Sequence, residues 1–285
     1  MNAQGGRTVI RNLGDVGKTK VETVTVAVEQ DFLFPLLRGR DVQAWRASPS
    51  AMILVPHRAD DFAQPVSVSD LKRRNPLTFE FFKRFEGQLK ARSGYKQLHN
   101  ARDEFYVVGN VGKYTLAPYK VVFKDLTELF QCAVVGRCAP EPMSGLRPVV
   151  PDHTLLFIAC EVEDEAYFLA GVLNSIPVRA ALYSASVGVQ TQRYYPTDVS
   201  RVRLPEWDKK DTLHREVCRI SRRCHEAAGS EEKIVAPIES EMELAEAVSQ
   251  IWSISPKEQG HLVRFYKEIQ TLRKRGTEVD AGDNE

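Results

Sequence analysis

Hydrophobic and polar positions alternate over short distances from the N-terminus to about Trp207, and Gly, Pro and Asp separate the alternating runs. Because successive side chains of a strand point to opposite faces, this pattern predicts short strands. The stretches RTVIRNL and KVETVTVAVE predict two strands, or one strand and a loose arm. Further strands are expected in SAMILVPH, EFYVVGN, YKVVF, FQCAVVG and TLLFIACEVE.

Helical spacing, with apolar residues at every third or fourth position, interrupts the strands in TFEFFKRFEGQLKARSGY and in DEAYFLAGVLNSIPVRAALYSAS. After LPEWDKK this spacing dominates, and residues 211 to about 275 are expected to be helical, with Ser255 and Pro256 as a helix-start pair. Apolar faces on these helices suit packing on the strand-rich part or on a partner helix. They contain Leu213, Val217, Ile220, Leu244, Val248 and Ile251.

These elements predict an α+β fold, in which a mixed, strand-rich domain with inserted helices precedes a C-terminal helical bundle. The expected divisions are an arm or short strands at 1–30, the strand-rich domain at 31–208, the helical domain at 209–275 and a disordered acidic tail at 276–285.

The stretch FPLLRGRDVQAW, from Phe34 to Trp45, has two readings. Its two arginines, Arg38 and Arg40, could form part of a site. Alternatively, Gly39 permits backbone angles that other residues resist, and Asp41 caps a short helix over VQAW, which makes the stretch a structural turn.

Composition limits the class of protein. The chain has 285 residues, of which 43% are hydrophobic, and its formal net charge is +1, so a basic surface must be local. The N-terminus has no apolar signal-peptide core, and no window approaches ~18 uninterrupted apolar residues. We therefore expect a cytoplasmic protein with no membrane partner. Five cysteines without a CxxC pair are expected to be reduced and mostly buried.

Familiar catalytic and metal-binding patterns are absent from the sequence. GDVGKTK resembles the end of a phosphate-binding loop, but Asn12 stands where that loop requires glycine. His214, Cys218 and His225 share a helix face that could hold a metal, although a packed helix face has the same spacing. No G-x-S-x-G, H-E-x-x-H or Rossmann glycine pattern occurs. We therefore expect no catalytic residue and no metal ligand.

A basic segment lies between Ser69 and Arg102, where nine basic residues stand against three acidic ones. Interleaved phenylalanines give it an apolar side, so its basic side faces either solvent or a phosphate backbone. The candidate phosphate contacts are Lys72, Arg73, Arg74, Lys83, Arg84, Lys90 and Arg92.

A second polar concentration is SVGVQTQRYYP, which reads as a loop. Glutamine can pair in two ways with adenine and arginine with guanine, so the loop could contact base edges, although polar loops are common. The candidates are Gln190, Gln192, Arg193 and Tyr194.

The order of the segments resembles a known region. PLLRGRDVQAWRA, MILVPH, NPLTFEFFKRFEGQLKARSGY, EFYVVG, APYKVVF, YFLAGVLNS and RVRLPEW follow one another as in the C-terminal target-recognition region of N6-adenine DNA methyltransferases. The groups most similar are the TaqI-like methylases and the fused type IIG restriction-modification enzymes. ESEMELAEAVSQIWSISPKE also looks like the helical segment that closes many type IIG chains.

The resemblance implies a specificity module for duplex DNA, in which 31–208 is the target-recognition domain. Catalysis and S-adenosylmethionine binding are then expected only in an associated methyltransferase domain or subunit, because this chain has neither the family's cofactor motif nor its catalytic motif. Arg38 or Arg40 would contact phosphate. Tyr119 and Lys120 recur in the family pattern, although Lys120 is also suited to bracing the fold, and Asn174 and Ser175 suit a helix end.

Two alternatives of other classes stay open. The chain could be a protein-interaction or regulatory module that keeps the fold without binding DNA, which its near-neutral charge favours slightly. It could also be an enzyme that uses the face of His214, Cys218 and His225.

Overall fold

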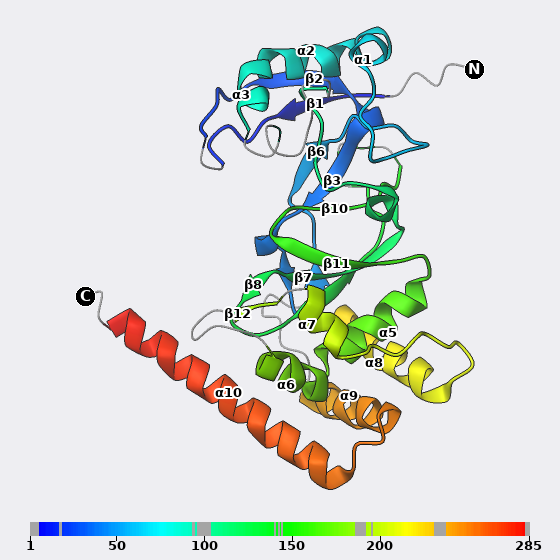
Figure 1. Ribbon diagram of the computed structural model, residues 1–285, viewed down its shortest axis with the longest axis vertical. Helices are drawn as coiled ribbons and strands as arrows, with labels where there is room; N and C mark the ends of the chain where they lie inside the picture. Colours follow the sequence, from blue (N-terminus) through cyan, green and yellow to red (C-terminus); the bar gives the residue numbers. More distant parts are fainter. Residues whose placement is uncertain are drawn as a thin grey trace. The chain divides into compact units, whose positions relative to one another are not determined.

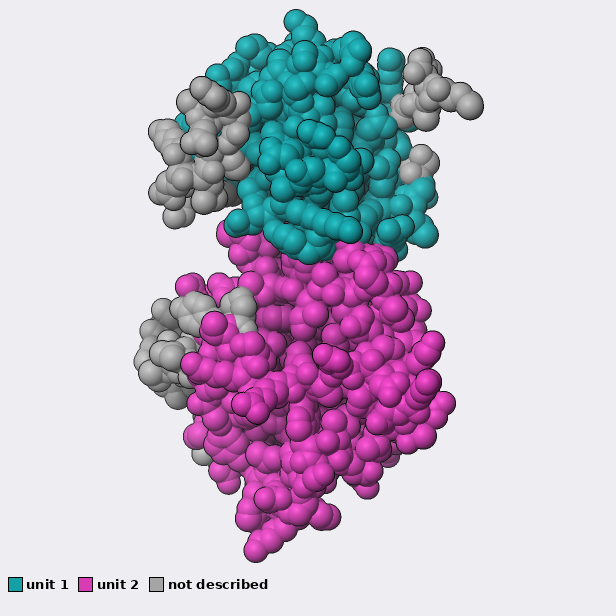
Figure 2. All heavy atoms as spheres, turned by 45° about the vertical axis from the view of Figure 1, so that its right-hand side comes forward, with its two compact units in different colours: residues 1–36, 51–116, 137–150 teal, residues 37–50, 117–136, 151–285 magenta. Residues whose placement is uncertain are grey.

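The computed structural model describes residues 6–16, 19–92, 95, 104–139, 141, 143, 145–185, 192–194, 196–230 and 238–282. The chain has the predicted α+β fold, with small sheets and helices in both halves (Figure 1). It divides into two compact units, coloured in Figure 2: unit 1 comprises residues 1–36, 51–116 and 137–150, and unit 2 comprises residues 37–50, 117–136 and 151–285. Among the described residues, no helix combines the length and apolarity that a membrane crossing requires.

The described residues of unit 1 form two small sheets and three short helices. Its strands are β1 (Arg7–Arg11), β2 (Thr25–Glu29), β3 (Leu33–Leu37), β6 (Ala51–Leu54) and β10 (Val150–Pro151), of which β3 and β10 each end with one residue that belongs to unit 2. The first two form an antiparallel hairpin, and β3 lies between β10 and β6 in the second sheet. The helices are α1 (Val68–Arg74), α2 (Pro76–Arg84) and α3 (Glu86–Ala91), and single 3₁₀ turns occupy Gln30–Phe32 and Lys113–Leu116.

The three helices follow local sequence signals, with one interruption. Ser67 begins α1 by accepting the Asp70 N–H on its hydroxyl at 3.1 Å. Pro76 begins α2 in the first helical position, where its missing N–H costs nothing. The single helix expected over TFEFFKRFEGQLKARSGY breaks at Phe85 (φ −108°, ψ 16°), which separates α2 from α3.

The strand expected in EFYVVGN is absent from the structure, which has turns and irregular backbone over residues 104–110. Phe105, Tyr106 and Val107 are consecutive and all buried. A strand with one face on a core would bury only alternate residues, so this apolar run fills the core as a loop. Phe82 of α2 packs 5.4 Å from Tyr106 between ring centroids.

Unit 2 is organised around an antiparallel sheet in which β7 (Tyr119–Lys124) lies between β11 (Leu155–Cys160) and β9 (Cys132–Val135). Two short ladders pair β4 (Val42–Gln43) with β5 (Arg46–Ala47) and β8 (Leu126–Thr127) with β12 (Gln192–Arg193). Its helices are α5 (Glu163–Asn174), α6 (Ile176–Ala185), α7 (Pro196–Arg201), α8 (Thr212–Ser230), α9 (Ile238–Ile251) and α10 (Pro256–Gly282).

The C-terminal helices share one core with this sheet. Val217 and Leu244 are buried in the same cluster as Phe123 and Phe168. Helix α8 lies along α5, and a Cβ on Gly171 would come within 2.7 Å of a Val217 side-chain carbon, so glycine is needed for this approach. The apolar helix faces therefore pack within the chain, and the boundary expected at 208/209 does not divide this core.

The start of α10 is as predicted, because Ser255 accepts the Glu258 N–H on its hydroxyl while the Glu258 carboxylate accepts the Ser255 N–H at 2.8 Å. The backbone helix then continues to Gly282, through residues that the sequence placed in the acidic tail.

Candidate nucleic-acid interface

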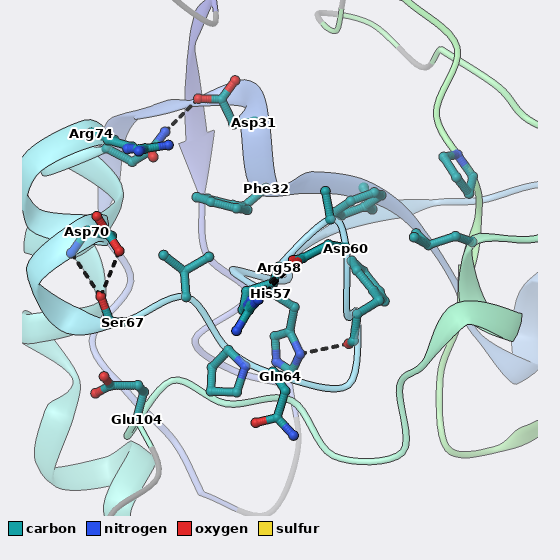
Figure 3. Close-up of a pocket in the computed structure, with 18 of the residues that line it drawn as sticks. Asp31, Phe32, His57, Arg58, Asp60, Gln64, Ser67, Asp70, Arg74 and Glu104 are labelled. Atoms are coloured by element: carbon teal, nitrogen blue, oxygen red, sulfur yellow. Dashed lines mark hydrogen bonds and ion pairs between the residues drawn. The ribbon is translucent and has the colours of Figure 1, made fainter.

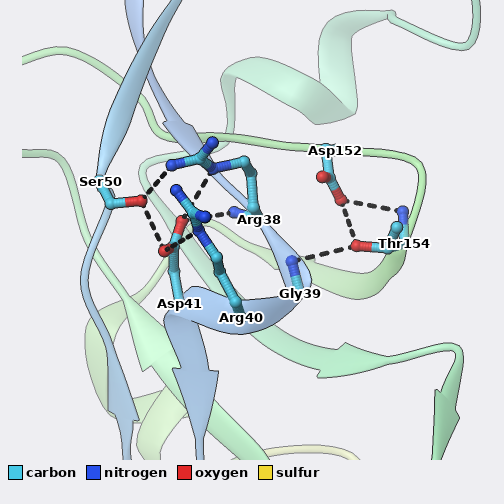
Figure 4. Close-up of polar contacts among 7 residues, drawn as sticks. All are labelled: Arg38, Gly39, Arg40, Asp41, Ser50, Asp152 and Thr154. Carbon is cyan, nitrogen blue, oxygen red and sulfur yellow. Dashed lines mark hydrogen bonds and ion pairs between the residues drawn. The ribbon is translucent and has the colours of Figure 1, made fainter. Parts of the chain in front are cut away.

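The turn that contains Arg38 and Arg40 is held by side chains from both sides (Figure 4). The Arg38 guanidinium donates to the Ser50 hydroxyl at 2.7 Å, and that hydroxyl donates to Asp41 Oδ1 at 2.5 Å. Only 12% of the Arg38 side chain is exposed, against 70% for Arg40. Of the two candidate phosphate contacts, Arg38 therefore belongs to the turn and Arg40 projects into solvent.

Gly39 is required in this turn by a close approach. A Cβ there would lie 2.7 Å from Thr154 Oγ1, which accepts the Gly39 N–H at 3.0 Å. The helix expected over VQAW does not form: a 3₁₀ turn covers Gly39–Asp41 and is followed by strand β4. Asp41 accepts the Arg38 N–H instead of capping a later helix.

Helices α1 to α3 carry the basic segment, with seven basic and three acidic residues in the range 68–92. Several of these cations lie beside carboxylates on the surface. The pairs are Arg73 with Asp70 (2.5 Å), Arg84 with Glu22 (3.1 Å), Lys83 with Glu86 (2.5 Å) and Lys90 with Glu86 (2.6 Å). Exposed ion pairs contribute only ~0–1 kcal/mol, so a phosphate can compete for these cations.

The remaining basic residues of the segment differ in their environment. Arg92 ties α3 to the neighbouring loop, because its Nη2 donates to the carbonyls of Phe105 and Val107, both at 3.0 Å. Lys72 and Arg74 are exposed and form no ion pair with a carboxylate in the described part of the chain. The Lys72 ammonium lies 5.9 Å from the centroid of the Phe79 ring. Lys72 and Arg74 are therefore the cations of α1 best placed for an external anion.

The other candidate DNA contacts lie in unit 2, and they differ in how far their side chains are exposed. Lys120 is 1% exposed, and its ammonium donates to the Ala117 carbonyl at 2.8 Å. It therefore braces the fold, which was the alternative to a DNA contact. Tyr119 is half-buried beside the sheet. Tyr194 is fully buried, with its ring centroid 5.3 Å from that of Phe130, so it cannot reach a base edge.

The structure describes Gln192, Arg193 and Tyr194 of the predicted base-reading loop. Gln190 lies outside the described residues, and only the backbone of Gln192 is described, as part of β12. Arg193 is half-exposed, and its Nε is 3.7 Å from a carboxylate oxygen of Asp125.

Asn174 ends α5, as expected for a helix end, and its side-chain amide pairs with both backbone groups of Cys132.

The helix face of His214, Cys218 and His225 packs and does not form a metal site. His225 Nδ1 donates to the Ser221 carbonyl at 2.8 Å, and its Nε2 accepts the Val134 N–H at 2.9 Å, so both ring nitrogens are occupied. The His214 ring lies 4.4 Å from that of Phe168 between centroids. In the part of the chain that the structure describes, no group of three His, Cys, Asp or Glu side chains is arranged for a metal ion.

Unit 1 contains a polar groove with a volume of about 1050 Å³ (Figure 3). Four arginines line it: Arg58, Arg74, Arg137 and Arg147. Four carboxylates line it too, and each accepts a hydrogen bond from the chain: Asp31 from Asn75, Asp60 from Arg58, Asp70 from Ser67 and Glu104 from the Val68 N–H.

The groove therefore has spare hydrogen-bond donors. Arg74 and Arg137 are exposed, and neither forms an ion pair with a carboxylate among the described residues. Arg147 is engaged, because it donates to the Asp31 carbonyl at 3.3 Å and its guanidinium lies 6.0 Å from the Phe34 ring centroid. A ligand that offers acceptor oxygens or nitrogens matches this lining.

The loop of residues 56–66, PHRADDFAQPV, borders the groove, and apart from Pro56 and His57, at the end of SAMILVPH, no sequence pattern had singled it out. Its polar residues show neither strand nor helix periodicity. The available signal was the pair of prolines, Pro56 and Pro65, on either side of an Arg-x-Asp-Asp turn.

No family model matches the chain. Over 170 residues it is 25% identical to the type II methyltransferase M.NspV of Nostoc sp. (strain ATCC 29411 / PCC 7524), a match that covers 59% of this chain and 31% of that protein. Its fold is similar to part of the type IIL restriction-modification enzyme MmeI, whose structure was solved in complex with DNA. That match has a TM-score of 0.53 and 11% identity, and it covers 85% of this chain and 31% of MmeI.

The chain thus spans about a third of the length of each protein that it matches. It is similar in sequence to part of a methyltransferase and in fold to part of a restriction-modification enzyme.

Proposed function

We propose that this chain recognises specific sequences in double-stranded DNA, as the target-recognition region of an N6-adenine DNA methyltransferase or restriction-modification system of the TaqI-like or type IIG kind. In this proposal, an associated domain or subunit binds S-adenosylmethionine and transfers the methyl group. The similarity to M.NspV supports the link to DNA methylation, and the fold likeness to MmeI supports DNA as the partner.

The observation that carries the proposal is the set of exposed cations around helix α1. Lys72 and Arg74 have no carboxylate partner among the described residues, and the groove beside Arg74 has its carboxylates already satisfied. Phosphate oxygens are the acceptors that such cations bind, and their neutralisation releases counterions from DNA. Arg73 has an exposed partner that a phosphate can displace.

The test is to select, from a pool of duplex DNA with a randomised sequence, the molecules that the purified protein retains. The selection is done with a competitor polyanion and at several salt concentrations. We expect an enriched motif, with affinity falling as salt rises. Reversing the charges of Lys72, Arg73 and Arg74 to glutamate should lower the affinity and make the salt dependence shallower.

The matched control reverses three exposed charges of unit 2, Lys209, Lys210 and Lys257, and so changes the net charge equally. It should bind as the unaltered protein does. If the two variants behaved alike, the assignment of the α1 surface would be wrong. If the unaltered protein retained no duplex at low salt, the alternative of a protein-interaction module would be favoured.

A further inference from the structure

The loop of residues 56–66, here called the groove loop, doubles back on itself as a short hairpin-like ribbon held by an isolated antiparallel bridge. The Val66 N–H donates to the Pro56 carbonyl at 2.9 Å, and the Arg58 N–H donates to the Gln64 carbonyl at 2.8 Å. His57 and Pro65 form an antiparallel bridge between these bonds. Arg58 and Gln64 are therefore opposite each other across the ribbon, where side chains share a face.

Two buried side chains fix the groove loop to unit 1. His57 is 3% exposed; its Nδ1 donates to the Phe62 carbonyl, and its Nε2 accepts the Val108 N–H, both at 3.0 Å. Phe62 is buried, with its ring centroid 5.7 Å from that of Phe34. These anchors lie within the ribbon and hold its tip, so the polar side chains on it are presented by a fixed backbone.

Arg58 is held in a defined orientation (Figure 3). Its Nε donates to Asp60 Oδ1 at 3.1 Å and its Nη2 to Asp60 Oδ2 at 2.6 Å. The pair uses two of the five guanidinium N–H donors, and three stay available. Half of the Arg58 side chain is exposed, and Gln64 is exposed beside it.

The charges around Arg58 favour a neutral partner over a phosphate. Asp60 and Asp61 lie on the same loop and are exposed, so a phosphate at this position would meet two carboxylates. Base edges in the major groove carry no net charge and offer acceptors and donors in fixed pairs. The major groove of DNA admits elements as wide as a two-stranded β-ribbon, so a hairpin-like loop can enter it.

We propose that the groove loop reads base edges in the major groove, with Arg58 bound to the two acceptors of a guanine and Gln64 bound to the donor and acceptor of an adenine. Asp60 is a positioning residue that orients Arg58. This inference rests on the proposed function and assigns the specificity to residues of unit 1 instead of the region of 190–195.

The experiment compares motifs selected from a randomised duplex pool by the unaltered protein and by Arg58→Lys and Gln64→Met. Arg58→Lys keeps the charge and loses the fork. We expect Arg58→Lys to lower the preference for guanine at one position of the motif about tenfold. Gln64→Met should lower the preference for adenine at another position by a similar factor. Affinity for an unrelated duplex and its salt dependence should stay unchanged. The matched control is Arg46→Lys, an exposed arginine of unit 2, which should select the original motif.

A motif that the loop variants select unchanged would overturn the inference and leave the proposed function standing. Binding without any sequence preference would overturn both the inference and the proposed sequence recognition. Failure of the unaltered protein to retain duplex at low salt would overturn both. Circular dichroism and thermal unfolding of each variant establish that the fold is intact.

Discussion

The carboxylate of Glu29 accepts two hydrogen bonds from Thr78, one from its backbone N–H at 2.8 Å and one from its hydroxyl at 2.7 Å. Its other oxygen accepts the Leu77 N–H at 3.1 Å. Leu77 and Thr78 lie in the first turn of α2, where N–H groups have no partner within the helix. The last residue of β2 thus caps a helix distant in sequence.

Replacing Glu29 with alanine should lower the free energy of unfolding by about 3 kcal/mol, because it removes charge-assisted hydrogen bonds and leaves buried donors of Thr78 unsatisfied. Glu29→Gln should cost less, since the amide oxygen still accepts. Glu80→Ala, at an exposed position of the same helix, is the control and should change stability by less than about 0.5 kcal/mol. Urea unfolding measures all three, and equal losses for Glu29→Ala and Glu80→Ala would contradict the cap.

Glu29 should also contribute to acid sensitivity. Burial alone would raise its pKa, but the hydrogen bonds from Thr78 and Leu77 outweigh this effect and hold the pKa below the ordinary value of 4.5. Its stabilisation is therefore present above the unfolded pKa of 4.5 and lost as pH falls through the lower folded value. Stability measured from pH 6 to about pH 3 should fall less steeply in Glu29→Gln than in the unaltered protein.

Asp41 should matter for stability more than the neighbouring Arg40. Its side chain is 6% exposed, and it accepts the Arg38 N–H at 2.9 Å and the Ser50 hydroxyl at 2.5 Å. Asp41→Ala should cost about 2 kcal/mol of unfolding free energy, since the Arg38 N–H and the Ser50 hydroxyl lose their acceptor. Arg40→Ala removes an exposed cation whose Nε lies 3.8 Å from Asp41 Oδ1, beyond hydrogen-bond distance, and should cost less than about 0.5 kcal/mol. A larger loss of unfolding free energy from Arg40→Ala than from Asp41→Ala would contradict this prediction.

The half-buried His225 should make the protein less stable below neutral pH. Burial lowers its pKa to about 4, from an ordinary value of 6.5. The neutral ring is favoured in the fold, so its contribution is complete above pH 6.5 and declines as pH falls from 6.5 towards 4. The full decline in the free energy of unfolding is on the order of 3 kcal/mol.

Urea unfolding at pH 7.5 and pH 4.5 measures this effect. The His225→Gln variant should show a smaller difference between the two pH values than the unaltered protein, whereas His153→Gln, at an exposed position, should keep the original difference. An unchanged difference in His225→Gln would show that this imidazole does not carry the effect.

Thiol reactivity should distinguish Cys138 from the other cysteines. All five are free, and only Cys138 is not fully buried. Burial raises the pKa of every one of these thiols, to about 12 for Cys160 and about 11 for Cys224, so few thiolates form at neutral pH. An aromatic disulfide reagent should modify one thiol in the native protein, none quickly in Cys138→Ser, and all five in denaturant. Rapid modification of a second native thiol would contradict this burial.

Local patterns predicted many elements because they record which side of an element faces the core. The alternation in YKVVF and TLLFIACEVE corresponds to β7 and β11, and the helical spacing after LPEWDKK corresponds to α8, α9 and α10. The patterns failed where tertiary contacts outweighed periodicity. Phe105 and Tyr106 are neighbours that both fill the core, and the helix broke at Phe85.

The candidate site was predictable only as a list of residue types. The sequence shows that basic residues gather between Ser69 and Arg102, but not that Arg92 donates to backbone carbonyls or that Lys83 and Lys90 share Glu86. Which cations meet an external anion depends on the groups that fold beside them.

Composition and periodicity were sufficient for the α+β class, the kinds of elements and the total charge, because each of these depends on the residues alone or on near neighbours. Folding decided accessibility: it buried Lys120 and Tyr194, and it placed His57 against Val108. Burial and hydrogen-bond partners depend on contacts between residues that can lie far apart in the chain. No local sequence pattern encodes such contacts.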